Sequence, residues 1–172
     1  MCMVGSGGPL SHQKVPVVDR PDMPGYGLLP SDQGAGLLAW DWLRQRMESA
    51  RNYWLVTASP EGRPHSVPIW GVWLDDKFFF AVGQSSRKGR NLAQNQWAII
   101  HLESGDEVAI AEGPVQPMPD MGEKHPAARA YQLKYEVDLV GNPVYCLLPQ
   151  RAFGWLEADF PGTATRWRFD PD

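Results

Sequence analysis

The feature that most constrains this chain is a succession of short β-type segments, each ended by a turn signal. Aromatic and β-branched residues are frequent in segments 53–58, 63–74, 77–82, 97–102, 107–115, 144–156 and 165–169. Turn-forming residues separate several of these segments, as in Ser59-Pro60-Glu61-Gly62, Asp75-Asp76 and Ser104-Gly105-Asp106. Short strands joined by tight turns build antiparallel sheet. The pattern therefore predicts a mainly β fold of the α+β class, a closed or nearly closed antiparallel β-barrel with peripheral helices.

Three modest helices are expected around this sheet. In segment 37–51 apolar residues recur at spacings of three and four, the period of an amphipathic helix, at Leu38, Trp42, Leu43, Met47 and Ala50. A short second helix follows an N-cap at Ser85 or Ser86 and ends near Asn95. Segment 123–135 is the third, with a proline near its start.

The first 36 residues differ from the rest in composition. They are rich in Gly and Pro and show little periodicity, which disfavours regular structure. We therefore expect residues 1–36 to be a flexible N-terminal arm and residues 37–172 to be a single domain. Tyr26, Leu28 and Leu29 leave open whether this arm docks on the barrel or on a second subunit.

Composition and charge narrow the classes of partner. The formal net charge is −4, and the 16 Lys and Arg residues are scattered, so nucleic acid is not an expected partner. No apolar run approaches the roughly 20 residues that span a bilayer, and the first residues do not resemble a secretion signal. We expect a cytoplasmic protein without a membrane partner. The four histidines and two cysteines, Cys2 and Cys146, lack metal-ligand spacing, so neither a metal site nor a disulfide is expected.

Segment 85–92 carries the clearest chemical signal. Its sequence, Ser85-Ser86-Arg87-Lys88-Gly89-Arg90-Asn91-Leu92, places hydroxyls and cations at the expected start of a helix, directly after a buried strand. Free backbone N–H groups, the helix dipole and a planar guanidinium all favour a bound phosphate there. From the residues alone, a capped surface helix with a solvated basic face is the alternative.

The order of motifs from residue 53 to residue 113 resembles the pyridoxamine 5′-phosphate oxidase-like flavoprotein superfamily. It begins with strand 53–58 and its Gly-containing turn, continues with Arg63-Pro64-His65-Ser66-Val67-Pro68-Ile69-Trp70, and ends in Ser86-Arg87-Lys88 with Asn91-Leu92. The resemblance implies an FMN-binding split β-barrel. It also implies that strand 65–70 passes beside the flavin ring and that the Ser-Arg-Lys stretch holds the cofactor phosphate.

The resemblance assigns candidate cofactor-binding residues to several parts of the chain. On the strand and on the floor that leads to the loop they are His65, Ser66, Val67, Pro68, Ile69, Trp70, Ala81, Val82 and Gly83; at the loop and helix they are Ser85, Ser86, Arg87, Lys88 and Asn91. The resemblance further implies a homodimer with the cofactor at the subunit interface. Trp155 and Arg166 in the C-terminal strands are the candidates for contacts from the second subunit. No catalytic residue is assigned.

The function this implies is a flavin-dependent oxidoreductase that acts on a small-molecule substrate. FMN is the first choice of cofactor, and the deazaflavin coenzyme F420 is the alternative. Segment 165–171 only partly matches the substrate-gripping end of true pyridoxamine phosphate oxidases, so we expect a planar, more apolar substrate on an aromatic wall of Trp70, Trp73, Trp155 and Trp167. A non-catalytic cofactor-binding or sensor protein on the same barrel remains the competing hypothesis.

Overall fold

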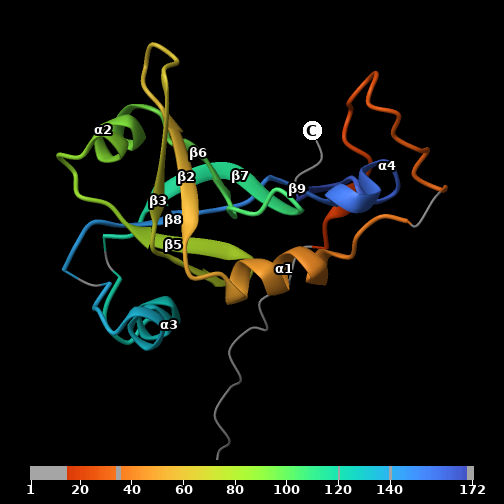
Figure 1. Cartoon of the computed structure of the whole chain (residues 1–172). Helices are drawn as coiled ribbons and strands as arrows, with labels where there is room; N and C mark the ends of the chain where they lie inside the picture. The colour runs from red at the N-terminus through yellow and green to blue at the C-terminus, as the bar shows by residue number, and fades with distance from the viewer. Residues whose placement is uncertain (1–14, 34–35, 120, 140, 170–172) are drawn as a thin grey trace, which may run out of the picture.

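The computed structural model describes residues 15–33, 36–119, 121–139 and 141–169, so Cys2 and the ends of the chain lie outside the described residues (Figure 1). The strands are β1 (Val17–Asp19), β2 (Tyr53–Ala58), β3 (Pro64–Ile69), β4 (Val72–Leu74), β5 (Lys77–Ala81), β6 (Trp97–His101), β7 (Glu107–Pro117), β8 (Val144–Leu147), β9 (Arg151–Leu156) and β10 (Thr165–Arg168). The α-helices are α1 (Trp40–Ser49), α2 (Arg87–Gln94), α3 (Pro126–Tyr135) and α4 (Phe160–Thr163).

The strands form two antiparallel layers that share β7. The larger layer has the order β1-β10-β9-β7-β6-β2-β3, and the smaller one pairs β4 with β5 and β5 with β8. The far end of β7 pairs with β8, with Val115 opposite Leu147, so one long strand joins both layers. Figure 1 shows α1 beneath the sheets, with α2 and α3 at opposite ends of the β2–β3 side. The predicted mainly β fold with peripheral helices is confirmed.

One face of the larger sheet forms the core. Neighbouring strands contribute Leu55, Ile100, Ala111, Ala152 and Trp167, all of which are fully buried. The predicted apolar stripe of α1 packs on this core through its fully buried Leu43 and Met47. Phe78, Phe79 and Phe80 of β5 are also buried, and Phe79 belongs to a second cluster beneath α3, so β5 is covered on both sides as expected.

The opposite face of the larger sheet is half-buried and mostly apolar. A row of paired residues crosses it from β3 to β10: Pro68, Trp54, His101, Ile110, Phe153 and Arg166. Alternation along each strand separates this face from the core. We call it the outward face.

Two elements differ from the sequence-based predictions. The return strand expected over 63–74 is divided at Trp70 and Gly71 into β3 and β4. The prediction that no regular structure precedes residue 37 is wrong for residues 17–19, because β1 pairs with β10. Tyr26 packs edge-to-face on Phe160 at 6.2 Å, so this described part of the arm docks on its own chain. The division of the chain at residue 37 stays a prediction.

Candidate functional site

The loop after β5 builds a tightly packed entry to α2. Ser86 is the N-cap of α2: its hydroxyl accepts a hydrogen bond from the Gly89 N–H at 3.1 Å and donates one to the Gly83 carbonyl at 2.7 Å. A Cβ at position 89 would lie 2.4 Å from the Gly83 oxygen, so only glycine allows this approach. The predicted cap is confirmed, and it fixes the direction of the helix N-terminus.

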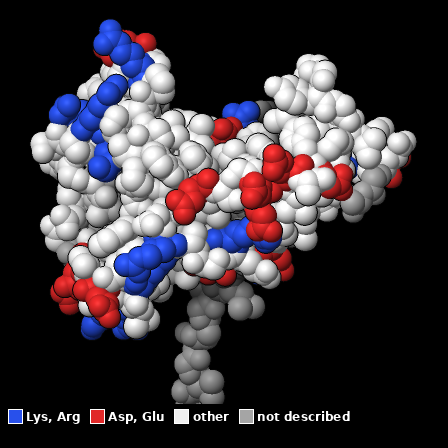
Figure 2. All heavy atoms as spheres, in the orientation of Figure 1, with Lys and Arg blue, Asp and Glu red and all other residues white. Residues whose placement is uncertain are grey.

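Two cations at this helix start have no acidic partner among the described residues. Arg87 is exposed and Lys88 is half-buried, and across the described residues neither lies within ion-pair distance of a carboxylate. Arg90 instead folds back and donates a hydrogen bond to the carbonyl of Ser85. Figure 2 shows basic side chains gathered over α2, and both basic and acidic side chains at the nearby tip of the β2–β3 hairpin. The helix N-terminus and these two cations therefore combine into one positive site.

His65 on β3 faces this positive site. Burial, together with the nearby charges of Arg87 and Lys88, lowers the pKa of His65. Its Nδ1 atom is buried and has no hydrogen-bond partner among the described residues. An unpartnered buried polar atom beside two uncompensated cations is the arrangement expected where an anionic ligand completes the site.

Asn91 and Val82, both predicted to bind cofactor, serve the fold. Asn91 is 5% exposed, and its amide donates a 3.0 Å hydrogen bond to the Thr57 hydroxyl, which anchors α2 on β2. Val82 is buried, and its N–H donates to the carbonyl of Pro143 at 3.0 Å. Half-buried Ala81 lies opposite Val144, whereas Gly83 is exposed. Of this predicted floor, only Ala81 and Gly83 retain accessible surface.

β3 is an edge strand, since it pairs with β2 alone. Prolines occur in edge strands where the backbone nitrogen points away from the neighbouring strand. Pro64 and Pro68 therefore mark the alternate positions of β3 whose backbone nitrogens point to the open edge. Ser66 lies between them at the same alternation, so its N–H also points to the open edge. The side chains of Val67 and Ile69 face the core instead, while Trp70 is 42% exposed. β3 can thus offer a ligand its backbone edge, its exposed Ser66 and Pro68, and the Trp70 ring.

The other two predicted contacts, Trp155 and Arg166, lie far from this site within the chain. Arg166 is on β10, five inter-strand steps from β3, which corresponds to about 24 Å along the sheet. Its Nε and Nη2 donate to the Asp19 carboxylate at 2.8 and 3.0 Å, and Arg168 adds a third bond to Asp19 at 3.0 Å. Hydrogen bonding to Arg166 lowers the pKa of Asp19. Sequence reasoning missed Asp19 because it lies in the Gly- and Pro-rich segment expected to be a flexible arm.

The expected aromatic wall does not form. Trp73 and Trp167 are 5% and 0% exposed and belong to the core. Trp155 is half-buried and packs edge-to-face on Phe160 at 5.6 Å. Of the four tryptophans, Trp70 alone presents a large exposed ring.

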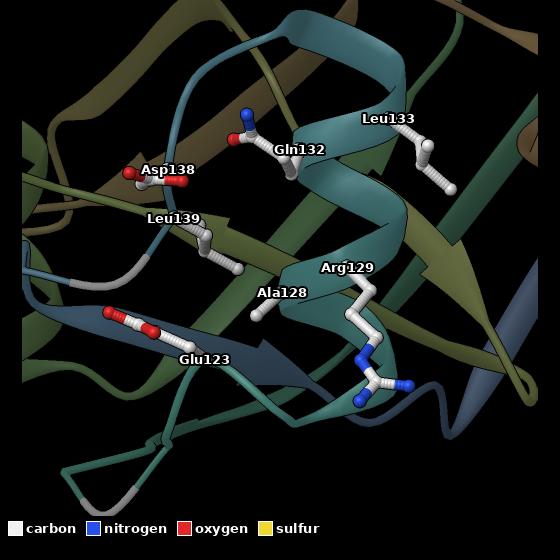
Figure 3. Close-up of a pocket in the computed structure, with 7 residues that line it drawn as sticks. All are labelled: Glu123, Ala128, Arg129, Gln132, Leu133, Asp138 and Leu139. Carbon is white, nitrogen blue, oxygen red and sulfur yellow. The ribbon is translucent and has the colours of Figure 1, made fainter.

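Two hollows lie outside the residues predicted to bind cofactor. One adjoins the loop before α2 and is lined by Gln84, Met118, Met121, Asn142 and Tyr145 among others. The second runs along α3, where Ala128 and Gln132 face Asp138 and Leu139 across the gap (Figure 3). No group of three or more His, Cys, Asp or Glu side chains among the described residues could hold a metal ion. In the same residues no helix is long and apolar enough to cross a membrane.

The antiparallel sheet with its peripheral helices is a split β-barrel of the pyridoxamine 5′-phosphate oxidase-like class. The family model described as pyridoxamine 5′-phosphate oxidase matches residues 40–159, and the chain belongs to this family. The predicted resemblance and fold are therefore confirmed. A search of curated proteins finds no match.

Solved structures of low sequence identity share the fold. A conserved hypothetical protein from Mycobacterium tuberculosis is 18% identical, with a TM-score of 0.61 over 69% of this chain and 85% of that one. A haem-binding protein from Mycobacterium smegmatis is 22% identical, with a TM-score of 0.54 over 69% of this chain and 55% of that one. An F420 reductase is 17% identical, with a TM-score of 0.51 over 63% and 94%. At these identities the likeness concerns the fold.

Proposed function

We propose that this chain is a flavin-dependent oxidoreductase that binds FMN, with the cofactor phosphate at the start of α2. The observation that carries the proposal is that, in the described part of the chain, Arg87 and Lys88 have no carboxylate partner and face a His65 Nδ1 with no hydrogen-bond partner. A phosphate supplies the negative charge and the acceptor oxygens that these groups lack. Coenzyme F420 also carries a phosphate, so it is the alternative cofactor for the same site, and an F420 reductase shares the fold.

The remaining candidate residues fit the rest of such a cofactor. The open edge of β3 supplies the Ser66 N–H and backbone carbonyls for the polar edge of a flavin ring, and Pro68 gives a flat apolar neighbour. When bound, the flavin supplies hydride or electron transfer. The chain's own residues hold and orient it: Arg87 and Lys88 bind the phosphate, His65 completes the anion site, and β3 sets the plane of the ring.

A homodimer would explain why Trp155 and Arg166 lie far from the candidate residues of β3 and α2 within one chain. Within one chain, Arg166 is five strands away from β3, about 24 Å measured along the sheet. The outward face carries half-buried Trp54, Ile110 and Phe153, and an apolar sheet face of this kind is suited to bury itself against a second copy. We propose that two outward faces pack together and that Trp155 of one subunit approaches the cofactor of the other.

The substrate we propose is a small planar organic molecule other than pyridoxamine phosphate. Arg168 lies in segment 165–171, which only partly matches the substrate-gripping end of pyridoxamine phosphate oxidases, and its guanidinium donates a 3.0 Å hydrogen bond to Asp19. A non-catalytic cofactor-binding or sensor role is the competing proposal, favoured by the shared fold of a haem-binding protein. A bound flavin that no tested electron donor or acceptor reduces or reoxidises would support that role.

The direct test is to titrate FMN and riboflavin into wild type, Arg87→Ala and Lys88→Ala and to follow flavin fluorescence. A charge-assisted hydrogen bond contributes about 1.5–3 kcal/mol, so each variant should bind FMN roughly tenfold to a hundredfold more weakly. Riboflavin has no phosphate, and its affinity should not change. Arg63→Ala, an exposed arginine on the hairpin, is the matched control. Unchanged FMN affinity in both variants would exclude this loop as the phosphate site.

A further inference from the structure

The break between β3 and β4 holds a rigid aromatic pair outside the anion site. Trp70 stacks on Tyr135 with ring centroids 4.8 Å apart and an interplanar angle of 9°. Tyr135 is 6% exposed, and its hydroxyl lies 2.6 Å from the carbonyl of Arg51 and 2.8 Å from that of Gly71. The Gly71 N–H donates back to the same hydroxyl at 3.1 Å. These bonds fix the lower ring, so Trp70 is held flat.

The backbone at this break cannot readily move. A Cβ at position 71 would lie 2.1 Å from the ring of Phe78, a fully buried core residue. Lys134 adds a bond from its Nζ to the Gly71 carbonyl at 3.1 Å. Trp70 is therefore 42% exposed, while the backbone beside it is fixed by Phe78, Tyr135 and Lys134.

A cation sits at the rim of the stacked pair. The Arg51 guanidinium is 6.0 Å from the Trp70 ring centroid and 5.5 Å from that of Tyr135. These nearly equal distances place it beside the pair and leave the outer face of Trp70 open. Arg51 is exposed, and no carboxylate in the described part of the chain lies within ion-pair distance of it. Nearby Lys134 is occupied by Tyr53 and Gly71.

We infer that Trp70 and Arg51 form the substrate subsite, and that it accepts a planar aromatic carboxylate. The aromatic ring stacks on the open face of Trp70, and the carboxylate pairs with the Arg51 guanidinium, whose planar fork matches it. This inference rests on the proposed function for its place beside the cofactor. Trp70 follows β3 directly, five residues or about 17 Å along the strand from His65. Under the proposed function, the ring of a flavin whose phosphate lies at His65 follows β3, and the subsite lies at the far end of that strand.

The test uses 2-naphthoate and its neutral analogue 2-naphthamide as probes, titrated by calorimetry into the protein as isolated and after loading with FMN. Wild type should bind naphthoate at least tenfold more tightly than naphthamide, as expected for a charge-assisted contact. Arg51→Gln should abolish that preference, and Trp70→Leu should weaken both probes several-fold. Trp70→Phe, which keeps a ring, should retain most of the affinity. Arg63→Gln should behave as wild type.

Two results would overturn the inference. One is a naphthoate preference that survives in Arg51→Gln, and the other is a preference that disappears in the Arg87→Ala/Lys88→Ala double variant, which would place the carboxylate at the phosphate site. FMN affinity is measured separately and should be unchanged in Arg51→Gln. If wild type failed to bind FMN but kept the naphthoate preference, the proposed cofactor would be wrong and the subsite would stand.

Discussion

Lys134 is a half-buried lysine whose ammonium group is held by two hydrogen bonds. Its Nζ donates to the Tyr53 hydroxyl at 2.8 Å and to the Gly71 carbonyl at 3.1 Å, and its ammonium lies 4.7 Å from the centroid of the Tyr53 ring. Burial and then the charge of Arg51 lower its pKa from 10.5 to about 8. The pKa of a partly buried lysine falls because desolvation disfavours its charged form. Because the pKa of Lys134 differs between the folded and unfolded chain, its protonation contributes to the pH dependence of the free energy of unfolding.

This pKa gives a test of the environment of Lys134. Between about pH 8 and pH 10.5 the unfolded chain holds a proton that the folded chain has lost, so the contribution of Lys134 to the free energy of unfolding rises with pH across that window. Lys134→Met removes the rise. Urea denaturation from pH 7 to pH 10 should show wild type gaining stability relative to this variant. Lys124→Met, at an exposed position, is the control, and parallel pH curves for Lys134→Met and wild type would contradict the shift.

Single residues also show where sequence reasoning about the site succeeded and where it stopped. The Ser86 cap could be predicted because capping depends on local sequence, and the Ser-Arg-Lys run marked the positive site. The buried environment of His65, the bond between Asn91 and Thr57, and the rim position of Arg51 depend on contacts between distant segments. No local pattern carries such information, so these roles required the structure.

At the level of elements, a buried side-chain hydrogen bond helps to anchor α2 on β2. Asn91 and Thr57 are 5% and 2% exposed, so neither has water as a replacement partner. Asn91→Ala should lower the free energy of unfolding by about 1–3 kcal/mol, because the Thr57 hydroxyl loses its donor. A double-mutant cycle with Thr57→Val, read by urea denaturation, isolates the pair. Additive effects of the two substitutions would show that the bond contributes nothing.

Most elements could be predicted because their signals are local. The spacing of the apolar residues in α1 predicted a helix, and the run of phenylalanines in β5 predicted a buried strand. β1 could not be predicted, since three residues with no alternation become a strand only when β10 offers an edge. The break at Trp70 was missed for a similar reason. Gly71 must pass close to the Phe78 ring, and the alternation of residues along the strand does not predict this contact.

At the scale of the whole molecule, the outward face is an apolar surface that a single chain leaves only half-buried. It places Trp54, Ile99 and Phe153 on a half-buried surface between β3 and the distant Arg166. The hairpin and the docked arm rise on either side of a hollow in Figure 2. A second copy of the chain seated in that hollow would cover the apolar row and shorten the path between β3 and the C-terminal strands of its partner.

Ile110→Arg tests this assembly, because it inserts a charge in the middle of the apolar row, between His101 and Phe153. Burying an unpaired charge at an interface is costly, so this variant should sediment as a monomer at micromolar concentration where wild type is a dimer. Leu133→Arg is the matched control: Leu133 is 85% exposed on α3, away from the outward face, and its substitution should leave the dimer intact. Because the proposed cofactor pocket needs both subunits, the monomeric variant should also lose FMN affinity while keeping its thermal unfolding cooperative. A wild-type monomer that binds FMN tightly would refute the shared pocket and confine the cofactor to α2 and β3 of one chain.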